Sequence, residues 1–244
     1  MKGYDNASGF TLVEMAIVMV IVALMLGGLM MSLSQTTENT RRSDAKVQLD
    51  RILDALYGFA QAKGRLPCPA TPASSGAELP AGGGVCGLQH GFVPSATLGL
   101  TGAVNADGLL LDPWNAPYRY SVTTANAGAF TKTGVGGMQA TTMANLAPDL
   151  RVCREAASSN IISATLPVVI LSTGKNWASF TSADEIANAG ETTVGGGPSG
   201  AVYRMANNRD FVSAGYNEAN FDDLISWLSP NILYTKMIAA GKLP

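Results

Sequence analysis

A long apolar run near the start of the sequence constrains this chain more than any other feature. Between Phe10 and Leu33 every residue is apolar or glycine, apart from Thr11, Glu14 and Ser32. A helix over this run would be about 36 Å long, which is enough to cross the hydrocarbon core of a bilayer. An ionisable residue is costly to bury in such a run, so Glu14 is predicted to have a function.

The residues at the start of this run carry a resemblance to a known family. Residues 9–14 read GFTLVE, and a short polar segment precedes them. This pattern is similar to the prepilin signature of type IV pilins and type II secretion pseudopilins. In that family a membrane peptidase cuts after the glycine and methylates the new N-terminal phenylalanine. The resemblance implies a leader at residues 1–9, cleavage between Gly9 and Phe10, and N-methylation of Phe10.

The same resemblance gives Glu14 a partner. Cleavage would leave a positively charged amine on Phe10, four residues before the Glu14 carboxylate. Opposite charges in apolar surroundings are tolerated only when they pair. In the family's mode of assembly, Glu14 of an incoming subunit would neutralise the Phe10 amine of its neighbour. A head-to-tail contact of this kind generates an open helical filament.

Two other interpretations of the apolar run stay open at this point. One is an ordinary signal anchor whose Glu14 reaches the membrane interface. The other is a secretory signal peptide, which would need a shorter apolar core and a small-x-small cleavage site. The sequence SLS at residues 32–34 is a poor match to that site. We favour the prepilin interpretation.

The charges that flank the run favour the opposite topology from that of a pilin. Lys2 precedes the run, whereas three basic residues follow it at positions 41, 42 and 46, and positive charges usually stay on the cytoplasmic side. Long domains cross membranes largely regardless of such charges, and cysteines favour an oxidising compartment. We therefore expect a single-pass inner-membrane protein with a periplasmic domain, which later enters a pilus or pseudopilus filament.

The apolar run is predicted to continue as one helix to about Lys63. Neither glycine nor proline occurs over residues 30–57, and apolar residues recur at helical spacing over residues 49–60. The sequence GRLPCP at residues 64–69 then ends the helix, because glycine and proline are poor helix formers. Beyond it, the chain up to residue 108 is predicted to be mostly irregular.

These boundaries divide the chain into four parts. They are a leader at residues 1–9, a transmembrane or filament-core helix at 10–34, an amphipathic second half of the helix at 35–63, and a periplasmic or extracellular globular domain at 64–244. The resemblance implies a pilin-like α+β fold. In that fold the long N-terminal helix packs on an antiparallel β-sheet with extended loops and short C-terminal helices.

Several segments of the globular domain have local signals. Residues 112–122, DPWNAPYRYSV, resemble the segment where pilins and pseudopilins enter their sheet, with Asn115 in place of the usual glycine. Ser229, Pro230 and Gly241 predict the start and the end of a final helix. The other predicted elements are a strand at 167–171, a loop at 189–200, strands at 201–205 and 210–213, and an amphipathic helix over 221–228.

Three cysteines allow three single-bridge pairings, and sequence alone does not choose between them. We favour a disulfide between Cys68 and Cys86, because a bond that closes the flexible loop between them stabilises the fold most. Cys153 would then be unpaired. No cofactor or metal site is predicted, since no C-x-x-C occurs and His90 has no partner at ligand spacing.

The resemblance raises the question of a calcium site, because major pseudopilins carry a calcium loop after a Ser-x-Gly turn. Here a turn of this kind occupies residues 172–174, and Asp184 and Glu185 follow it. Two adjacent acids do not make an oxygen cage, so calcium is not predicted.

Composition separates the remaining functional classes. Charged residues make up only 14% of the 244 residues and the net charge is −2, so nucleic acid is not a predicted partner. A membrane-anchored envelope enzyme is disfavoured because the chain has one histidine and neither a G-x-S-x-G motif nor a metal motif. A filament-tip adhesin or binding module is compatible with the glycine-rich loops, although no ligand is identified.

The favoured function is therefore that of a structural, minor subunit of a type IV pilus-like filament. The alternative within the same family is a type II secretion pseudopilin. The implied partners are prepilin peptidase, other pilin or pseudopilin subunits, the inner-membrane assembly platform and the lipid bilayer.

Overall fold

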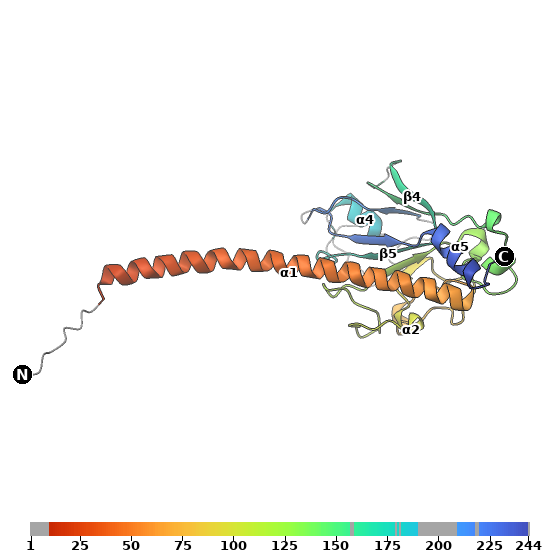
Figure 1. Cartoon of the computed structure of the whole chain (residues 1–244), viewed down its shortest axis with the longest axis horizontal. Helices are drawn as coiled ribbons and strands as arrows, with labels where there is room; N and C mark the ends of the chain where they lie inside the picture. Colours follow the sequence, from red (N-terminus) through yellow and green to blue (C-terminus); the bar gives the residue numbers. More distant parts are fainter. Residues whose placement is uncertain are drawn as a thin grey trace, which may run out of the picture. The chain divides into compact units, whose positions relative to one another are not determined.

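The computed structural model describes residues 10–156, 159–178, 180, 182–189, 209–217 and 220–243, except for the side chains of residues 26–34. The chain divides into two compact units, Met1–Ser43 and Asp44–Pro244. Helix α1, Leu12–Lys63, begins in the first unit and ends in the second (Figure 1). Its bounds agree with the single long helix that the sequence predicts.

The part of α1 in the second unit buries one apolar face. Five residues at helical spacing are each at most 1% exposed: Ala45, Leu49, Ile52, Leu56 and Ala60. The helix ends because Gly64 adopts a φ of +71°, a left-handed conformation that glycine tolerates. The N–H of Gly64 still bonds to the carbonyl oxygen of Ala60 at 2.8 Å, which closes the last turn. The predicted stripe and the predicted end are both confirmed.

A four-stranded antiparallel sheet forms the centre of the second unit. Its spatial order is β1-β2-β5-β7, and the strands are β1 His90–Phe92, β2 Arg119–Val122, β5 Val168–Ser172 and β7 Leu224–Trp227. Tyr120 of β2 lies opposite Ile170 of β5. The strands predicted within residues 112–122 and at 167–171 are the two central strands of this sheet.

Strand β5 is buried on both faces because its residues alternate between two layers. Val168 and Ile170 pack in one cluster with the apolar stripe of α1. Val169 and Leu171 pack in another cluster, with residues of a second sheet. The order of layers in this unit is therefore helix, first sheet, second sheet, which explains why an apolar run without alternating polar residues forms a strand here.

The second sheet differs from the prediction of a single antiparallel sheet. It contains β4 Ile161–Leu166, β3 Leu150–Cys153 and β6 Asp210–Val212, in that spatial order. Strands β3 and β4 are antiparallel, but β3 and β6 are parallel, with Val152 opposite Phe211. The strand predicted at residues 210–213 is thus confirmed. Its parallel pairing with β3 could not be predicted, because the two strands are far apart in the sequence.

The predicted amphipathic helix over residues 221–228 is wrong. These residues contain β7, in which Leu224 lies opposite Ser172 and Trp227 opposite Val169. Strand β7 pairs with the edge of β5 opposite β2, so the buried backbone groups of β5 have hydrogen-bond partners on both edges. The stability from these long-range hydrogen bonds outweighs a weak local preference for helix. Only one of the predicted C-terminal helices therefore forms.

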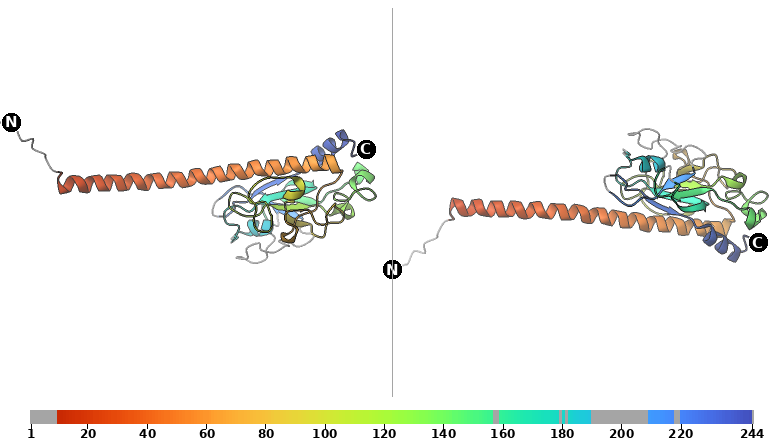
Figure 2. Two further views of the ribbon diagram at one scale, coloured as in Figure 1. Left: turned by 90° about the horizontal axis from the view of Figure 1, so that it is seen from below. Right: turned by 90° about the horizontal axis from the view of Figure 1, so that it is seen from above.

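The final helix, α5 Pro230–Ala239, begins and ends as predicted. Ser229 occupies its N-cap position, Pro230 its first position, and Gly241 has a φ of +65° after its end. Helix α5 lies beside the C-terminal end of α1 (Figure 2), where Gln61 Nε2 donates to the carbonyl oxygen of Lys236 at 3.4 Å.

Short elements complete the second unit. The helices are α2 Ser95–Leu98, α3 Ala125–Gly128 and α4 Ala183–Ala189, and single 3₁₀ turns cover Pro72–Ser74, Met138–Ala140 and Met143–Asn145. The strand predicted at residues 201–205 lies outside the described residues, as does all but the start of the loop predicted at 189–200.

The irregular segment after α1 is held by a disulfide and a buried ion pair. Cys68 and Cys86 are bonded, with Cα atoms 5.4 Å apart, and Cys153 is free and buried. Arg65 and Glu78 form an ion pair at 2.6 Å. Both side chains are buried, with exposed fractions of 5% and 6%. The pairing that the sequence analysis favours is therefore the one present in the structure.

The turn that leads into β2 is organised by Asp112. Its Oδ1 accepts hydrogen bonds from the backbone N–H groups of Trp114 at 2.9 Å and Ala116 at 2.8 Å, and its Oδ2 accepts one from the Ser172 hydroxyl at 2.5 Å. Asn115 has a φ of +65°, as its replacement of a glycine predicts. Burial raises the pKa of Asp112 to about 6, against the lowering effect of these hydrogen bonds.

This pKa predicts a pH dependence of stability. The folded protein binds the Asp112 proton more tightly than the unfolded chain, so stability should fall as pH rises from the ordinary carboxyl value of 3.8 to about 6. The loss should be on the order of 2–3 kcal/mol. Asp112→Asn keeps the Oδ1 acceptor and does not titrate, so its urea unfolding should lack this component. Equal pH slopes for the variant and the wild type would contradict the prediction.

Candidate functional site

Helix α1 begins with reciprocal hydrogen bonds between Thr11 and Glu14. The backbone N–H and the hydroxyl of Thr11 both donate to Glu14 Oε2 at 2.9 Å, and the N–H of Glu14 donates to Thr11 Oγ1 at 3.2 Å. Because Leu12 is the first helical residue, Thr11 holds the N-cap position and Glu14 the third helical position. This arrangement is a capping box. It supplies hydrogen-bond acceptors to backbone N–H groups at the start of the helix, which have no acceptor within the helix itself.

The capping box is a role of Glu14 that the sequence analysis missed. The signal was present, because Thr followed three residues later by Glu and then by an apolar run is the sequence pattern of a capping box. Phe10 is the first described residue and is 84% exposed. Gly9, the predicted cleavage residue, lies outside the described residues.

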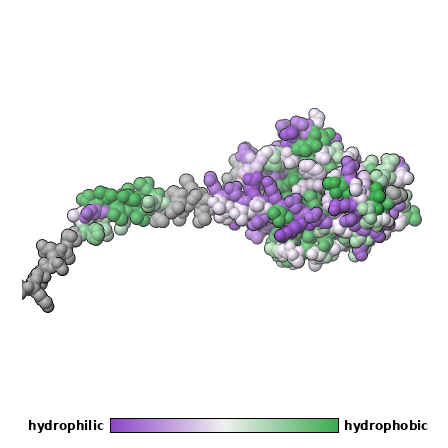
Figure 3. Space-filling model, in the orientation of Figure 1, coloured by the Kyte–Doolittle hydropathy of each residue, from purple (hydrophilic) through white to green (hydrophobic). Residues whose placement is uncertain are grey.

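The part of α1 that follows the capping box has apolar side chains exposed on all sides. From Leu12 to Met25 the large apolar side chains are between 47% and 91% exposed, and they include six consecutive residues at 17–22, which point to every side of a helix. Figure 3 shows them on the face in view. A helix that is apolar all round requires apolar surroundings, either lipid or other protein.

Among the residues that the structure describes, no helix is both long enough and apolar enough to cross a bilayer. The predicted transmembrane segment, residues 10–34, includes residues 26–34, whose side chains lie outside the description.

Comparison with known families places these features in one motif. Residues 4–30 match the prokaryotic N-terminal methylation motif. This is the type IV pilin and pseudopilin signature. The pilin signature covers the capping box and the exposed apolar stretch, and it is typical of structural proteins that are not enzymes. Comparisons with curated proteins and with solved structures give no match to this chain.

One pair in the second unit has the residue types of a nucleophile and a base. His90 Nδ1 lies 2.8 Å from Ser121 Oγ, and the two residues are opposite each other on β1 and β2. His90 is 1% exposed and Ser121 is fully buried. A substrate has no access to such a pair, so we assign it a role in joining the two strands rather than in chemistry.

Three carboxylates from distant parts of the sequence come together in the second unit. Oxygen atoms of Glu185, Asp222 and Asp223 lie within 4.8 Å of one another, and all three residues are buried. Oxygen donors of this kind suit hard cations. Among the described residues, these three carboxylates are the group that could hold such a cation. Asp184, which precedes Glu185 in the sequence, is not part of this group, and its carboxylate accepts a hydrogen bond from the N–H of Ala156 at 2.6 Å.

The hydrogen bonds of this carboxylate cluster tie neighbouring elements together. Glu185 Oε1 accepts from Asn176 Nδ2 at 2.9 Å, and Asp222 Oδ2 accepts from the N–H of Lys175 at 2.7 Å. Asn188 of α4 donates to Asp223 Oδ2 at 2.7 Å. Burial raises the pKa of Asp223 well above its usual range. Protonation of Asp223 would lower the repulsion between the carboxylates, and the hydrogen bonds from Asn176, Lys175 and Asn188 give the cluster a structural role.

Proposed function

We propose that this chain is a subunit of a type IV pilus-like filament. The observation that carries the proposal is the match of residues 4–30 to the N-terminal methylation motif. Prepilin peptidase would remove residues 1–9 by cutting after Gly9 and would methylate the new amine of Phe10. Support also comes from the exposed apolar side chains between Leu12 and Met25, which need lipid or neighbouring helices around them.

In this proposal the apolar helix has two successive environments. Residues 10–34 first lie in the inner membrane, with residues 35–63 and the domain at 64–244 on the periplasmic side. An assembly platform then moves the subunit into the filament, where the same helix contacts other pilin or pseudopilin subunits. Glu14 of one subunit pairs with the Phe10 amine of its neighbour, because two isolated charges in apolar surroundings are costly.

We further propose a minor subunit rather than the bulk subunit of the filament. The support is the chain's length of 244 residues, with a C-terminal part that continues beyond the central sheet to helix α5. A type II secretion pseudopilin is the alternative, because the two systems use the same helix and the same peptidase.

The mass of the N-terminal peptide tests the proposal. The protein is purified from its native host without a tag at its N-terminus, digested and measured by mass spectrometry. We expect a peptide that starts at Phe10 and carries one additional methyl group. A start at Met1, or a cut beyond Leu33, would rule out the pilin interpretation in favour of a signal anchor or a secreted protein.

A further inference from the structure

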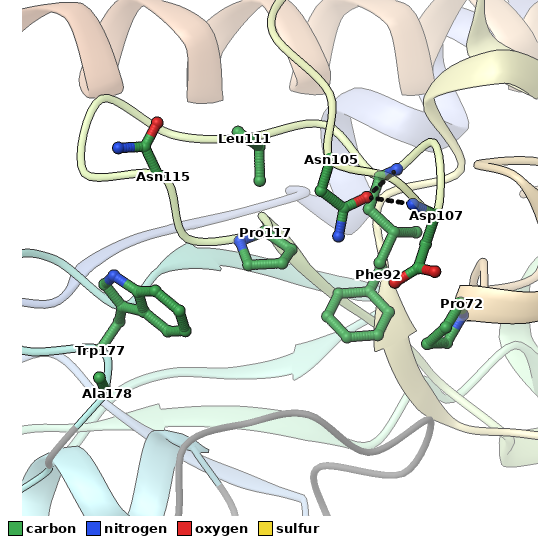
Figure 4. Close-up of a pocket in the computed structure, with 10 residues that line it drawn as sticks. Pro72, Phe92, Asn105, Asp107, Leu111, Asn115, Pro117, Trp177 and Ala178 are labelled. Carbon is green, nitrogen blue, oxygen red and sulfur yellow. Dashed lines mark hydrogen bonds between the residues drawn. The ribbon is translucent and has the colours of Figure 1, made fainter.

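A pocket of about 580 Å³ opens in the second unit. Its volume lies within the range of small-molecule sites, which combine apolar walls with a few polar groups. The walls are mostly apolar, with the polar side chains of Asn105 and Asp107 at one end and that of Asn115 at the other (Figure 4). The apolar part of the lining includes Phe92, Leu111, Pro117 and Trp177. None of these residues belongs to the pilin signature.

The side chains of Asn105 and Asp107 come from one fixed turn. Asn105 Oδ1 accepts hydrogen bonds from the N–H groups of Asp107 at 3.0 Å and Leu109 at 2.9 Å. These bonds fix the amide of Asn105 through its oxygen and leave its Nδ2 as a donor. Within the described part of the chain, neither Asn105 Nδ2 nor the Asp107 carboxylate bonds to another residue. This end of the pocket thus has one donor and one charged acceptor near each other in sequence.

Trp177 contributes a ring surface rather than a hydrogen bond. Its Nε1–H donates to the carbonyl oxygen of Trp114 at 3.2 Å, so the indole donor is used within the protein. In the view of Figure 4, the rings of Trp177 and Phe92 lie on either side of Pro117. Phe92, also a lining residue, is 2% exposed, and the guanidinium of Arg119 lies 4.6 Å from its ring centroid.

We propose that this pocket binds a neutral saccharide. A sugar ring has apolar C–H faces that stack on aromatic and prolyl surfaces, such as those of Trp177 and Pro117. Each hydroxyl group of a sugar both donates and accepts hydrogen bonds. Two neighbouring hydroxyls therefore match Asn105 Nδ2 and the Asp107 carboxylate together. This inference does not depend on the proposed filament role.

The charges of the lining separate a saccharide from other small ligands. An anion is disfavoured because, among the described residues, the lining contains a carboxylate and no basic side chain. A cationic amine would leave the Asn105 Nδ2 donor without a partner, because an ammonium group accepts no hydrogen bond. In addition, the Phe92 ring already packs against the Arg119 cation, which weakens its attraction for a second one. An uncharged ligand with hydroxyl groups fits both Asn105 and Asp107.

Calorimetric titration tests the proposal on the full-length protein. The protein is kept in lauryldimethylamine oxide, a detergent without a sugar head group, and titrated with maltose, cellobiose and N,N′-diacetylchitobiose. N-acetyl-lysine amide serves as the cationic probe. We expect at least one disaccharide to bind with a Kd of about 1 mM and the amine not to bind.

Two variants and one control locate the binding. Asn105→Asp keeps an oxygen for the turn but removes the donor, and Asp107→Ala removes the acceptor while its N–H stays in place. Each should weaken binding about tenfold, a difference of about 1.4 kcal/mol. The control Asp50→Ala changes an exposed acid of α1 outside the pocket and should bind like the wild type. The proposal is overturned if no disaccharide binds at about 10 mM, if both pocket variants bind like the wild type, or if only the amine binds.

Discussion

A Glu14→Ala variant is expected to insert into the membrane, to lose its leader and to fail to enter the filament. Without the carboxylate, the Phe10 amine of the neighbouring subunit would have no opposite charge in apolar surroundings. Breaking a buried pair by removing one partner costs about 3–5 kcal/mol, which corresponds to far more than a tenfold loss of assembled protein. Immunoblots of sheared filaments and of membranes measure the two populations, and the N-terminal peptide of the membrane form shows whether cleavage occurred.

A Glu14→Gln variant separates the charge of Glu14 from its capping role. The glutamine oxygen can still accept from the N–H of Thr11, so the capping box is kept. Loss of a helix cap alone costs about 0.5–2 kcal/mol. If pairing with an amine is the function of Glu14, the Gln variant fails to assemble as the Ala variant does. Assembly of the Gln variant at the wild-type level would instead show that Glu14 acts only as a cap.

A Glu78→Ala variant should lower the free energy of unfolding by about 3–5 kcal/mol. Two nitrogens of Arg65 bond to Glu78 at 2.6 and 2.7 Å, and the N–H of Cys68 also donates to the Glu78 carboxylate at 3.1 Å. The substitution leaves the Arg65 guanidinium buried without its counter-charge. Urea unfolding of the full-length protein in detergent, followed by tryptophan fluorescence, measures the loss.

Two comparisons identify the cause of this loss. The double variant Arg65→Met with Glu78→Leu removes both charges and should cost less than Glu78→Ala, because no unpaired charge stays buried. Asp210→Ala breaks the ion pair between Arg151 and Asp210, whose side chains are 45% and 42% exposed, and should cost less than about 1 kcal/mol. A Glu78→Ala cost as small as that of Asp210→Ala would mean that burial of the first pair has no energetic consequence.

The parts of the fold that the sequence predicts are those with a complete local signal. Gly64 followed by two prolines ends α1, and Ser229, Pro230 and Gly241 bound α5. At each of these positions, one or a few residues decide the backbone conformation, so no distant contact is needed. The methylation motif is also local, which is why residues 9–14 suffice to find it.

The features that the sequence analysis missed depend on contacts between distant residues. Strand β7 was predicted as a helix because its partner β5 lies more than fifty residues earlier, a separation that local periodicity does not report. The carboxylate cluster joins Glu185 to Asp222 and Asp223 across residues that include a segment outside the description. The pocket needs β1, the turn at Asn105 and the chain at Trp177 together. Each requires the tertiary fold.

The disulfide between Cys68 and Cys86 determines how the second unit would carry a mechanical load. Residues 69–85 lie inside the covalent ring that it closes. When the chain is pulled between α1 and the central sheet, tension passes through the sulfur–sulfur bond and bypasses those residues. In a subunit whose helix is fixed in a filament, drag on the domain would pull on the chain in this way. Glu78, which lies inside the ring and forms half of the buried ion pair, would then carry no tension. Reduction would place that segment directly under tension.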